Sequence, residues 1–86
     1  MKRCFYLEKI ATDGEELIVK DEIGKLILED FYIYNMEEDG DKILKIRINN
    51  SDEIVMVRND EHFTFKYPIF SCVVIEQCAV KYGGVY

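Results

Sequence analysis

The sequence has no apolar run long enough to cross a membrane: no stretch approaches the roughly 20 consecutive apolar residues that a spanning helix needs. Its first five residues, Met1-Lys2-Arg3-Cys4-Phe5, also lack the apolar segment and the small-residue cleavage site of a secretion signal. We therefore expect a cytoplasmic protein without a membrane-spanning segment.

Basic residues are scarce relative to acidic ones. The chain has 11 lysines and arginines against 17 aspartates and glutamates, which gives a formal net charge of -6 and a pI near 4.7. A domain with this charge is repelled by phosphate backbones and by anionic lipid. The balance argues against direct binding to nucleic acid or membranes, and it favours a protein partner with a basic surface.

Cysteine is also sparse, and its spacing fits no zinc-binding pattern. The three cysteines, Cys4, Cys72 and Cys78, cannot all pair within one chain. On one extended strand, Cys72 and Cys78 would lie about 20 Å apart, which is beyond disulfide reach. We expect reduced, half-buried apolar side chains, with a bridge to Cys4 or an intermolecular link as the alternative.

The chain has few candidates for catalysis or metal binding. The only histidine, His62, has no cysteine near it in the sequence, so we expect it in a solvated turn. Asp39-Gly40-Asp41 lies in an acidic loop, but Lys42 and Ile43 interrupt the alternating ligands of a calcium loop. Adjacent loop carboxylates both see water, and so lack the unlike environments that acid–base catalysis needs. We expect no enzyme activity, metal or cofactor.

What the sequence does contain is enough apolar material for one folded domain. Its 86 residues are 49% apolar and 13% aromatic, which argues against disorder. We expect residues 1–86 to form a single small β domain with a small core. Short apolar runs alternate in it with acidic clusters, namely Glu15-Glu16, Asp21-Glu22, Glu29-Asp30, Glu37-Glu38-Asp39, Asp52-Glu53 and Asp60-Glu61.

These runs predict an all-β fold. Apolar runs of this length, bounded by polar clusters, are typical of half-buried strands with the acids in the loops. An antiparallel meander of such strands would close into a small barrel or fold over as a sandwich. Gly83-Gly84 should release a short tail after the last strand. The expected strands cover residues 3–10, 16–20, 25–36, 43–49, 54–58 and 63–67, with one or two more in 69–82.

One segment has a competing helical interpretation. Thr12 and Glu15 match a capping box, which could open a short helix near 15–23. The apolar residues 17–19 are consecutive rather than three and four apart, and two of them are β-branched. We therefore favour a strand.

The longest expected strand changes its alternation midway. Leu28 lies at an even-numbered position, whereas Phe31 and Ile33, after Glu29-Asp30, lie at odd-numbered positions. In a regular strand they would face opposite sides. A β-bulge supplies the one extra residue that returns all three to the same face. The opposite face then carries Tyr32, Tyr34 and Met36.

The acidic loops are expected to gather at one end of the sheet. Segment 37–41 holds an Asp-Gly pair between two alternating runs, which indicates a hairpin loop. In a meander, successive loops alternate between the two ends, so 12–16, 37–41 and 59–62 would share one end. Such an acidic end would steer the chain toward a cationic surface. Acids in turns also serve simply to keep a small β-protein soluble.

The tyrosines beside these acids are the best candidate contact residues. Tyrosine adds contact area at interfaces, whereas the stacking aromatics of nucleic-acid binders lie among lysines and arginines. The alternative is that both faces of this strand are buried in a sandwich or dimer. The residues expected to bind a partner are Glu37, Glu38, Asp39, Asp41, Asp60, Glu61, Tyr32 and Tyr34.

Together these features favour a non-enzymatic protein-binding module. More specifically, they favour a small accessory inhibitor that blocks a basic, nucleic-acid-handling protein. The alternative is a self-assembling structural subunit, in which strand edges such as 3–10 or 69–82 pair between copies to form a homodimer or a larger homo-oligomer. A small-molecule-binding barrel is a third option, and the supply of large core residues argues against it.

Overall fold

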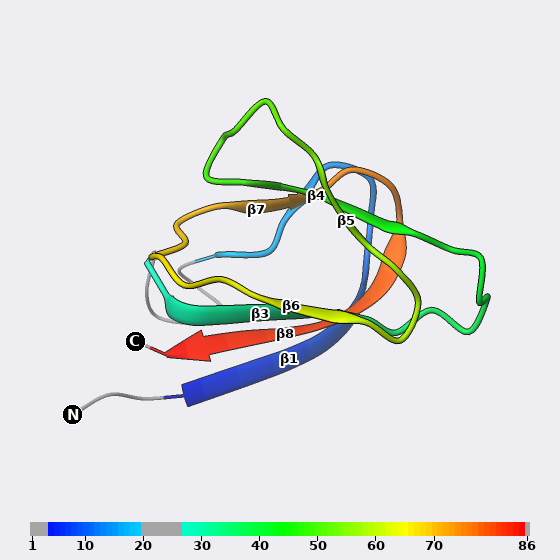
Figure 1. Cartoon of the computed structure of the whole chain (residues 1–86), viewed down its shortest axis with the longest axis horizontal. Helices are drawn as coiled ribbons and strands as arrows, with labels where there is room; N and C mark the ends of the chain where they lie inside the picture. The colour runs from blue at the N-terminus through cyan, green and yellow to red at the C-terminus, as the bar shows by residue number, and fades with distance from the viewer. Residues whose placement is uncertain (1–3, 20–26, 86) are drawn as a thin grey trace.

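A computed structural model describes residues 4–19 and 27–85 of the chain. In these residues, two four-stranded antiparallel sheets pack face to face as a sandwich and do not close into a barrel (Figure 1). The predicted all-β class is confirmed, with the sandwich as its architecture. The described residues contain no helix that could span a membrane. The strands are β1 (Cys4–Ala11), β2 (Glu15–Glu16), β3 (Glu29–Asn35), β4 (Leu44–Ile48), β5 (Val55–Val57), β6 (His62–Thr64), β7 (Cys72–Val74) and β8 (Cys78–Val85).

The strand order is that of a jelly roll rather than of a meander. One sheet has the order β1-β8-β3-β6 and the other β2-β7-β4-β5. The chain is thus folded back on itself as a double ribbon, in which β1 pairs with β8, β2 with β7, β3 with β6, and β4 with β5. The ribbon then wraps round, so that β8 meets β3 and β7 meets β4. Eight strands arranged in this way form the double-sheet jelly roll.

Among the described strands, sequence neighbours pair directly only at β4 and β5. This corrects the expectation that segment 37–41 is a hairpin loop, because it crosses from β3 in one sheet to β4 in the other. Within it, the Lys42 amide donates to the Asp39 carbonyl at 3.1 Å, and Gly40 does not have a left-handed backbone. The Asp-Gly pair therefore makes a turn, but not the hairpin turn that it suggested.

The core lies between the sheets and follows the predicted alternation. Leu44, Ile46 and Ile48 are buried along β4, and Lys45 and Arg47 between them are half-buried on the outer side. Alternate residues of β3 and β8 face the same core. The buried apolar side chains are Ala11, Leu17, Ile18, Leu28, Phe31, Ile33, Leu44, Ile46, Ile48, Val57, Phe65, Ile69, Cys72, Val74, Cys78, Val80 and Tyr82.

The predicted β-bulge is present at the start of β3. The pairing of β3 with β8 shifts register between Glu29 and Tyr32, and Asp30 has a left-handed backbone with φ of 49°. Leu28 and Phe31 are consequently both fully buried despite their opposite parity. A polar residue with a short side chain tolerates this backbone better than a bulky one.

Gly83 and Gly84 do not release a tail, as the sequence suggested, but lie within β8 beside the bulge. A Cβ atom on Gly84 would lie 3.1 Å from the Glu29 carbonyl oxygen and 3.3 Å from the Leu28 Cβ. The second glycine therefore allows the bulged strand to approach β8 closely. A strand interior tolerates glycine where another backbone comes this near.

The capping-box residues close a turn instead of opening a helix. The Glu15 carboxylate accepts hydrogen bonds from the Thr12 amide at 3.0 Å and from its hydroxyl at 3.2 Å. The Glu15 amide donates to the Thr12 carbonyl at 3.1 Å, and β2 follows at once. No helix is present as far as residue 19, and residues 20–23 of the helical alternative lie outside the described residues.

All three cysteines are free thiols, as expected, but none of them is half-buried as the sequence suggested. Cys72 and Cys78 are fully buried, whereas Cys4 is exposed. Burial raises the pKa of both inner thiols, that of Cys78 to about 11, with the Glu37 carboxylate contributing to the shift at Cys78. The expected final strand region proves to be two strands, β7 and β8, with one of these cysteines at the start of each.

Gly84→Ala tests the close approach of β8 to the bulge. We expect it to lower the free energy of unfolding by about 1–3 kcal/mol, because backbone atoms must move to admit the methyl group. Gly40→Ala is the matched control, since nothing lies within 4 Å of its Cβ position. It should change stability by less than about 0.5 kcal/mol in the same urea titration. Equal effects of the two substitutions would contradict this account of Gly84.

Candidate functional site

The outer side of the β1-β8-β3-β6 sheet carries an unusual set of aromatic and apolar side chains. Antiparallel pairing places Tyr6 and Tyr32 on either side of Gly83 in β8. In the next row, Glu8, Lys81, Tyr34 and His62 lie side by side across the four strands. We call this surface the tyrosine face; it comprises Tyr6, Glu8, Ile10, Tyr32, Tyr34, Met36, His62, Ala79, Lys81 and Gly83.

Several of these apolar side chains are open to solvent. Tyr6 is 63% exposed, Ile10 66% and Met36 37%, while Tyr32 and Tyr34 are half-buried. The Lys81 ammonium lies 4.9 Å from the centroid of the Tyr6 ring, a cation–π distance. Clustered exposed apolar side chains with polar groups around them mark interaction surfaces in soluble proteins.

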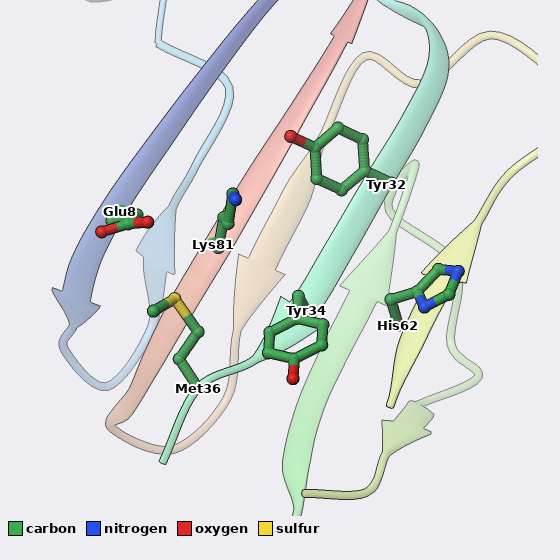
Figure 2. A pocket seen from close by; sticks show the side chains of 6 residues that line it. All are labelled: Glu8, Tyr32, Tyr34, Met36, His62 and Lys81. Atoms are coloured by element: carbon green, nitrogen blue, oxygen red, sulfur yellow. The ribbon is translucent and has the colours of Figure 1, made fainter. Parts of the chain in front are cut away.

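A hollow of about 440 Å³ lies at the centre of the tyrosine face (Figure 2). Tyr32 and Tyr34 line it from β3; the Tyr32 hydroxyl points towards β8 and the Tyr34 hydroxyl points away from Tyr32. Met36 extends over β8 towards β1. A second hollow, of about 480 Å³, adjoins it at Tyr32, and a third shares Glu8 with it. The three hollows lie along β8, because Ala79 has a small side chain and Gly83 has none. The central hollow is lined by Glu8, Tyr32, Tyr34, Met36, His62 and Lys81.

The acidic loops lie at one end of this face, as the sequence predicted. Asp13 accepts the Gln77 amide at 2.6 Å, and Glu37 accepts the Ala79 amide at 2.9 Å. The Asn59 side chain donates to the Glu37 carbonyl, which joins segment 37–41 to the loop before β6. Each strand reverses the direction of the previous one, so alternate loops share an end even though the strands form no meander. We call this end the acidic rim: Asp13, Glu15, Glu37, Glu38, Asp39, Asp41, Asp60, Glu61 and Glu76.

Asn35, at the end of β3, holds the loops of the acidic rim together. Its side-chain amide is fully buried and donates to the carbonyls of Lys42 at 2.9 Å and Val57 at 3.0 Å. Its side-chain oxygen accepts the Glu37 amide at 3.0 Å. The Asn35 backbone bonds to the loop before β6, donating to Glu61 and accepting from Asp60. One residue thus fixes both loops that carry most of the exposed acids of the rim.

Part of the rim's charge is engaged within the fold. Glu15 binds the Lys9 ammonium at 2.7 Å, and this contact together with hydrogen bonds from Thr12 lowers the Glu15 pKa below its ordinary value. Glu76 lies 3.2 Å from the Lys45 ammonium. The Glu37 carboxylate is committed to the Ala79 amide.

The exposed acids of the rim are the ones that a partner can reach. Glu38 and Asp41 point from the turn between β3 and β4, where Asp39 also accepts the Asp41 amide at 2.9 Å. Asp60 and Glu61 are exposed in the loop before β6. Of the acids expected to contact a partner, Glu37 is therefore engaged in a hydrogen bond within the fold, whereas the other five are exposed.

Tyr34 connects the tyrosine face to the acidic rim. Its hydroxyl donates to the Asp60 carboxylate at 3.3 Å. Partial desolvation of the hydroxyl and the negative charge of Asp60 raise the pKa of Tyr34 above its ordinary value. Aromatic and acidic side chains therefore form one continuous surface.

Sequence reasoning found part of this surface and missed the rest. Tyr32, Tyr34 and Met36 share a face, as the bulge argument predicted. Tyr6, Glu8, Ile10 and Lys81 were missed, because alternation within a strand does not say which strands pair. His62 was expected in a turn, but it begins β6 and lines the hollow. Glu76 was missed because the loop between β7 and β8 lay inside one expected strand region.

In the described residues, no group of three or more histidine, cysteine or acidic side chains is arranged to hold a metal ion. No family model, curated protein or solved structure matches this chain. Its function is therefore inferred from the surface itself.

Replacing Asn35 tests its role in organising the rim. We expect Asn35→Leu to reduce the free energy of unfolding by about 2–3 kcal/mol, because buried carbonyls lose their donors. The Glu37 amide, which donates to the Asn35 side chain, should exchange its hydrogen faster than in the unmodified protein. Asn50→Gly is the control, because Asn50 is exposed and its φ of 59° suits glycine. Unchanged exchange at Glu37 would contradict the assignment.

Replacing Asp60 tests the contact between face and rim. Asp60→Asn keeps a side chain that tolerates the left-handed backbone at this position, where φ is 62°. Removing the negative charge should lower the Tyr34 pKa towards its ordinary value, because the charged phenolate is then less disfavoured. The Tyr34 ring carbon resonances, followed by NMR against pH, measure this. Asp52→Asn at the opposite end is the control and should leave the titration of Tyr34 unchanged.

Proposed function

We propose that this chain is a non-enzymatic protein-binding module that docks on a basic surface of its partner. The observation that carries the proposal is the continuity of the tyrosine face with the acidic rim through Tyr34 and Asp60. The partner we favour is a nucleic-acid-handling protein, whose activity the bound module would inhibit by covering its basic surface.

The tyrosine face has the composition of an interface core. Tyrosine and methionine are enriched at such cores, and a few aromatic side chains supply most of the binding energy. Tyr6 lies on β1, and Tyr32 and Tyr34 lie on β3, the two strands that flank β8. Because the sheet holds these strands in place, little conformational entropy is lost when a partner covers the side chains.

The acidic rim supplies the second part of an interface, a charged border. Exposed carboxylates of one sign steer a basic partner towards the surface and raise the association rate. Because the acidic rim and a nucleic acid are both negatively charged, the module and the nucleic acid would compete for the partner's basic groups. This competition is the physical basis of the proposed inhibition.

A self-assembling structural subunit is the second candidate. The observation that favours it is β1, an eight-residue strand at the edge of its sheet, which could add a strand from another copy. The net charge of -6 opposes close packing of identical copies. Sedimentation at micromolar concentration separates the two proposals, because a monomer removes the assembly proposal.

Paired charge reversals test the contribution of the acidic rim. Glu38→Lys with Asp41→Lys should weaken capture of a basic partner from the native host by at least about tenfold, because steering becomes repulsion. Asp52→Lys with Glu53→Lys makes the same charge change at the opposite end and should retain capture. Quantitative mass spectrometry of immobilised variants, at low and high salt, measures both. Equal losses would show that only net charge matters.

Truncation of exposed side chains in the same experiment tests the tyrosine face. Tyr6→Ala with Met36→Ala should lose the captured partner, because the apolar contact is removed. Tyr67→Ala with Met56→Ala removes side chains that are 53% and 59% exposed elsewhere on the surface, and should retain it. Retention of the same partner by the face variant would refute docking through the tyrosine face.

A further inference from the structure

We infer that the central hollow of the tyrosine face receives an arginine side chain of the partner. This inference rests on the proposed function and names the group that the tyrosine face recognises. The hollow, the rings that line it and the acids around it each contribute to the assignment.

The rings provide a stacking surface for a planar cation. Tyr32 and Tyr34 are two residues apart on β3 and project on the same side, and Figure 2 shows both rings at the hollow. A guanidinium group is planar and weakly hydrated, and it stacks on aromatic faces better than an ammonium group does. The thioether of Met36 adds a polarisable wall that adapts to the inserted side chain.

Carboxylates flank the hollow on two sides. Glu8 lines it from β1, and Asp60 lies beyond the Tyr34 hydroxyl that it binds at 3.3 Å. A guanidinium group has five N–H donors and no acceptor, so it suits acceptor groups such as the Glu8 carboxylate and the tyrosine hydroxyls.

Lys81 is the feature of the lining that opposes a cation. Its ammonium lies 4.9 Å from the centroid of the Tyr6 ring, and Glu8 is its direct cross-strand neighbour. Tyr6 and Glu8 both lie on β1, so they attract the Lys81 charge towards that strand, whereas Tyr34 and His62 lie on the other side of β8. An anionic ligand would gain from Lys81 but would meet Glu8 and the exposed acids of the rim. The balance of charge therefore favours arginine.

If the hollow binds arginine, replacing Lys81 should change the affinity in a predictable direction. In a titration followed by NMR, N-acetyl-arginine amide should shift the Met36 methyl and Tyr34 ring resonances saturably at concentrations on the order of 10 mM. N-acetyl-citrulline amide, the uncharged counterpart, should bind about fivefold more weakly. Lys81→Gln should strengthen binding of the arginine derivative roughly threefold by removing a nearby like charge.

Two substitutions at tyrosines distinguish the hollow from non-specific stacking. Tyr34→Leu keeps a bulky apolar side chain, and so protects the fold, but it should weaken binding about two- to fivefold by removing the ring. Tyr67→Ala, outside the tyrosine face, should leave binding unchanged. Equal binding of the citrulline derivative, weaker binding by Lys81→Gln, or the absence of shifts at Met36 and Tyr34 would each overturn the inference.

The outcome is separable from that of the proposed function. If capture of a partner depends on Tyr6, Met36, Glu38 and Asp41 while the arginine derivative does not bind, the inference fails and the proposed function stands. If the derivative binds while every variant captures the same proteins as the unmodified chain, the proposed function fails. In that case the hollow has no role in docking, and the inference about the partner fails with it.

Discussion

The buried amide of Asn35 is the constraint on which the functional end of the molecule depends. It lies at a position where the alternation of β3 would otherwise place an apolar side chain, and all of its side-chain polar atoms are engaged. An apolar residue there would leave buried carbonyls without donors, at a cost of about 1–3 kcal/mol for each group. The Cys78 thiol also donates to its oxygen, at 3.6 Å, so the start of β8 is tied to the same point. The two loops of the acidic rim thus have a fixed position relative to the sheet that carries the tyrosines.

That fixed position is what turns dispersed residues into one surface. Tyr6 and Tyr34 come from strands at different places in the chain, and the jelly roll places both strands beside β8. The two glycines of β8 have different roles. Gly84 allows the bulge of β3 to approach, and Gly83 leaves space between Tyr6 and Tyr32 on the outer side of the sheet. The bulge sets the parity of Tyr32 and Tyr34, which places their rings outside. Local backbone geometry therefore decides the composition of the face.

Local features of the fold were predictable from the sequence, and long-range ones were not. The alternation of Leu44, Ile46 and Ile48 marks β4, and the change of parity after Leu28 marks the bulge, because both patterns reflect burial of near neighbours. The grouping of acidic loops followed from strand reversal alone. Pairing was not predictable, since an apolar pattern identifies a buried face but not the strand beside it. For that reason segment 37–41 was wrongly expected to be a hairpin loop, and the contributions of Tyr6 and Lys81 to the face were missed.

The double ribbon also has a consequence for the order in which the chain can form its contacts. β4 and β5 are separated only by residues 49–54, and each further pair encloses the one before it: β3 with β6, β2 with β7, and β1 with β8. Once an inner pair has formed, the segments of the next pair are already close, so the entropy of loop closure is divided into small steps. The strand pairs can thus form in order, from the innermost pair, β4 with β5, to the outermost, β1 with β8. Its two most distant strands meet without a long, unfavourable search, even though their pairing spans nearly the whole sequence.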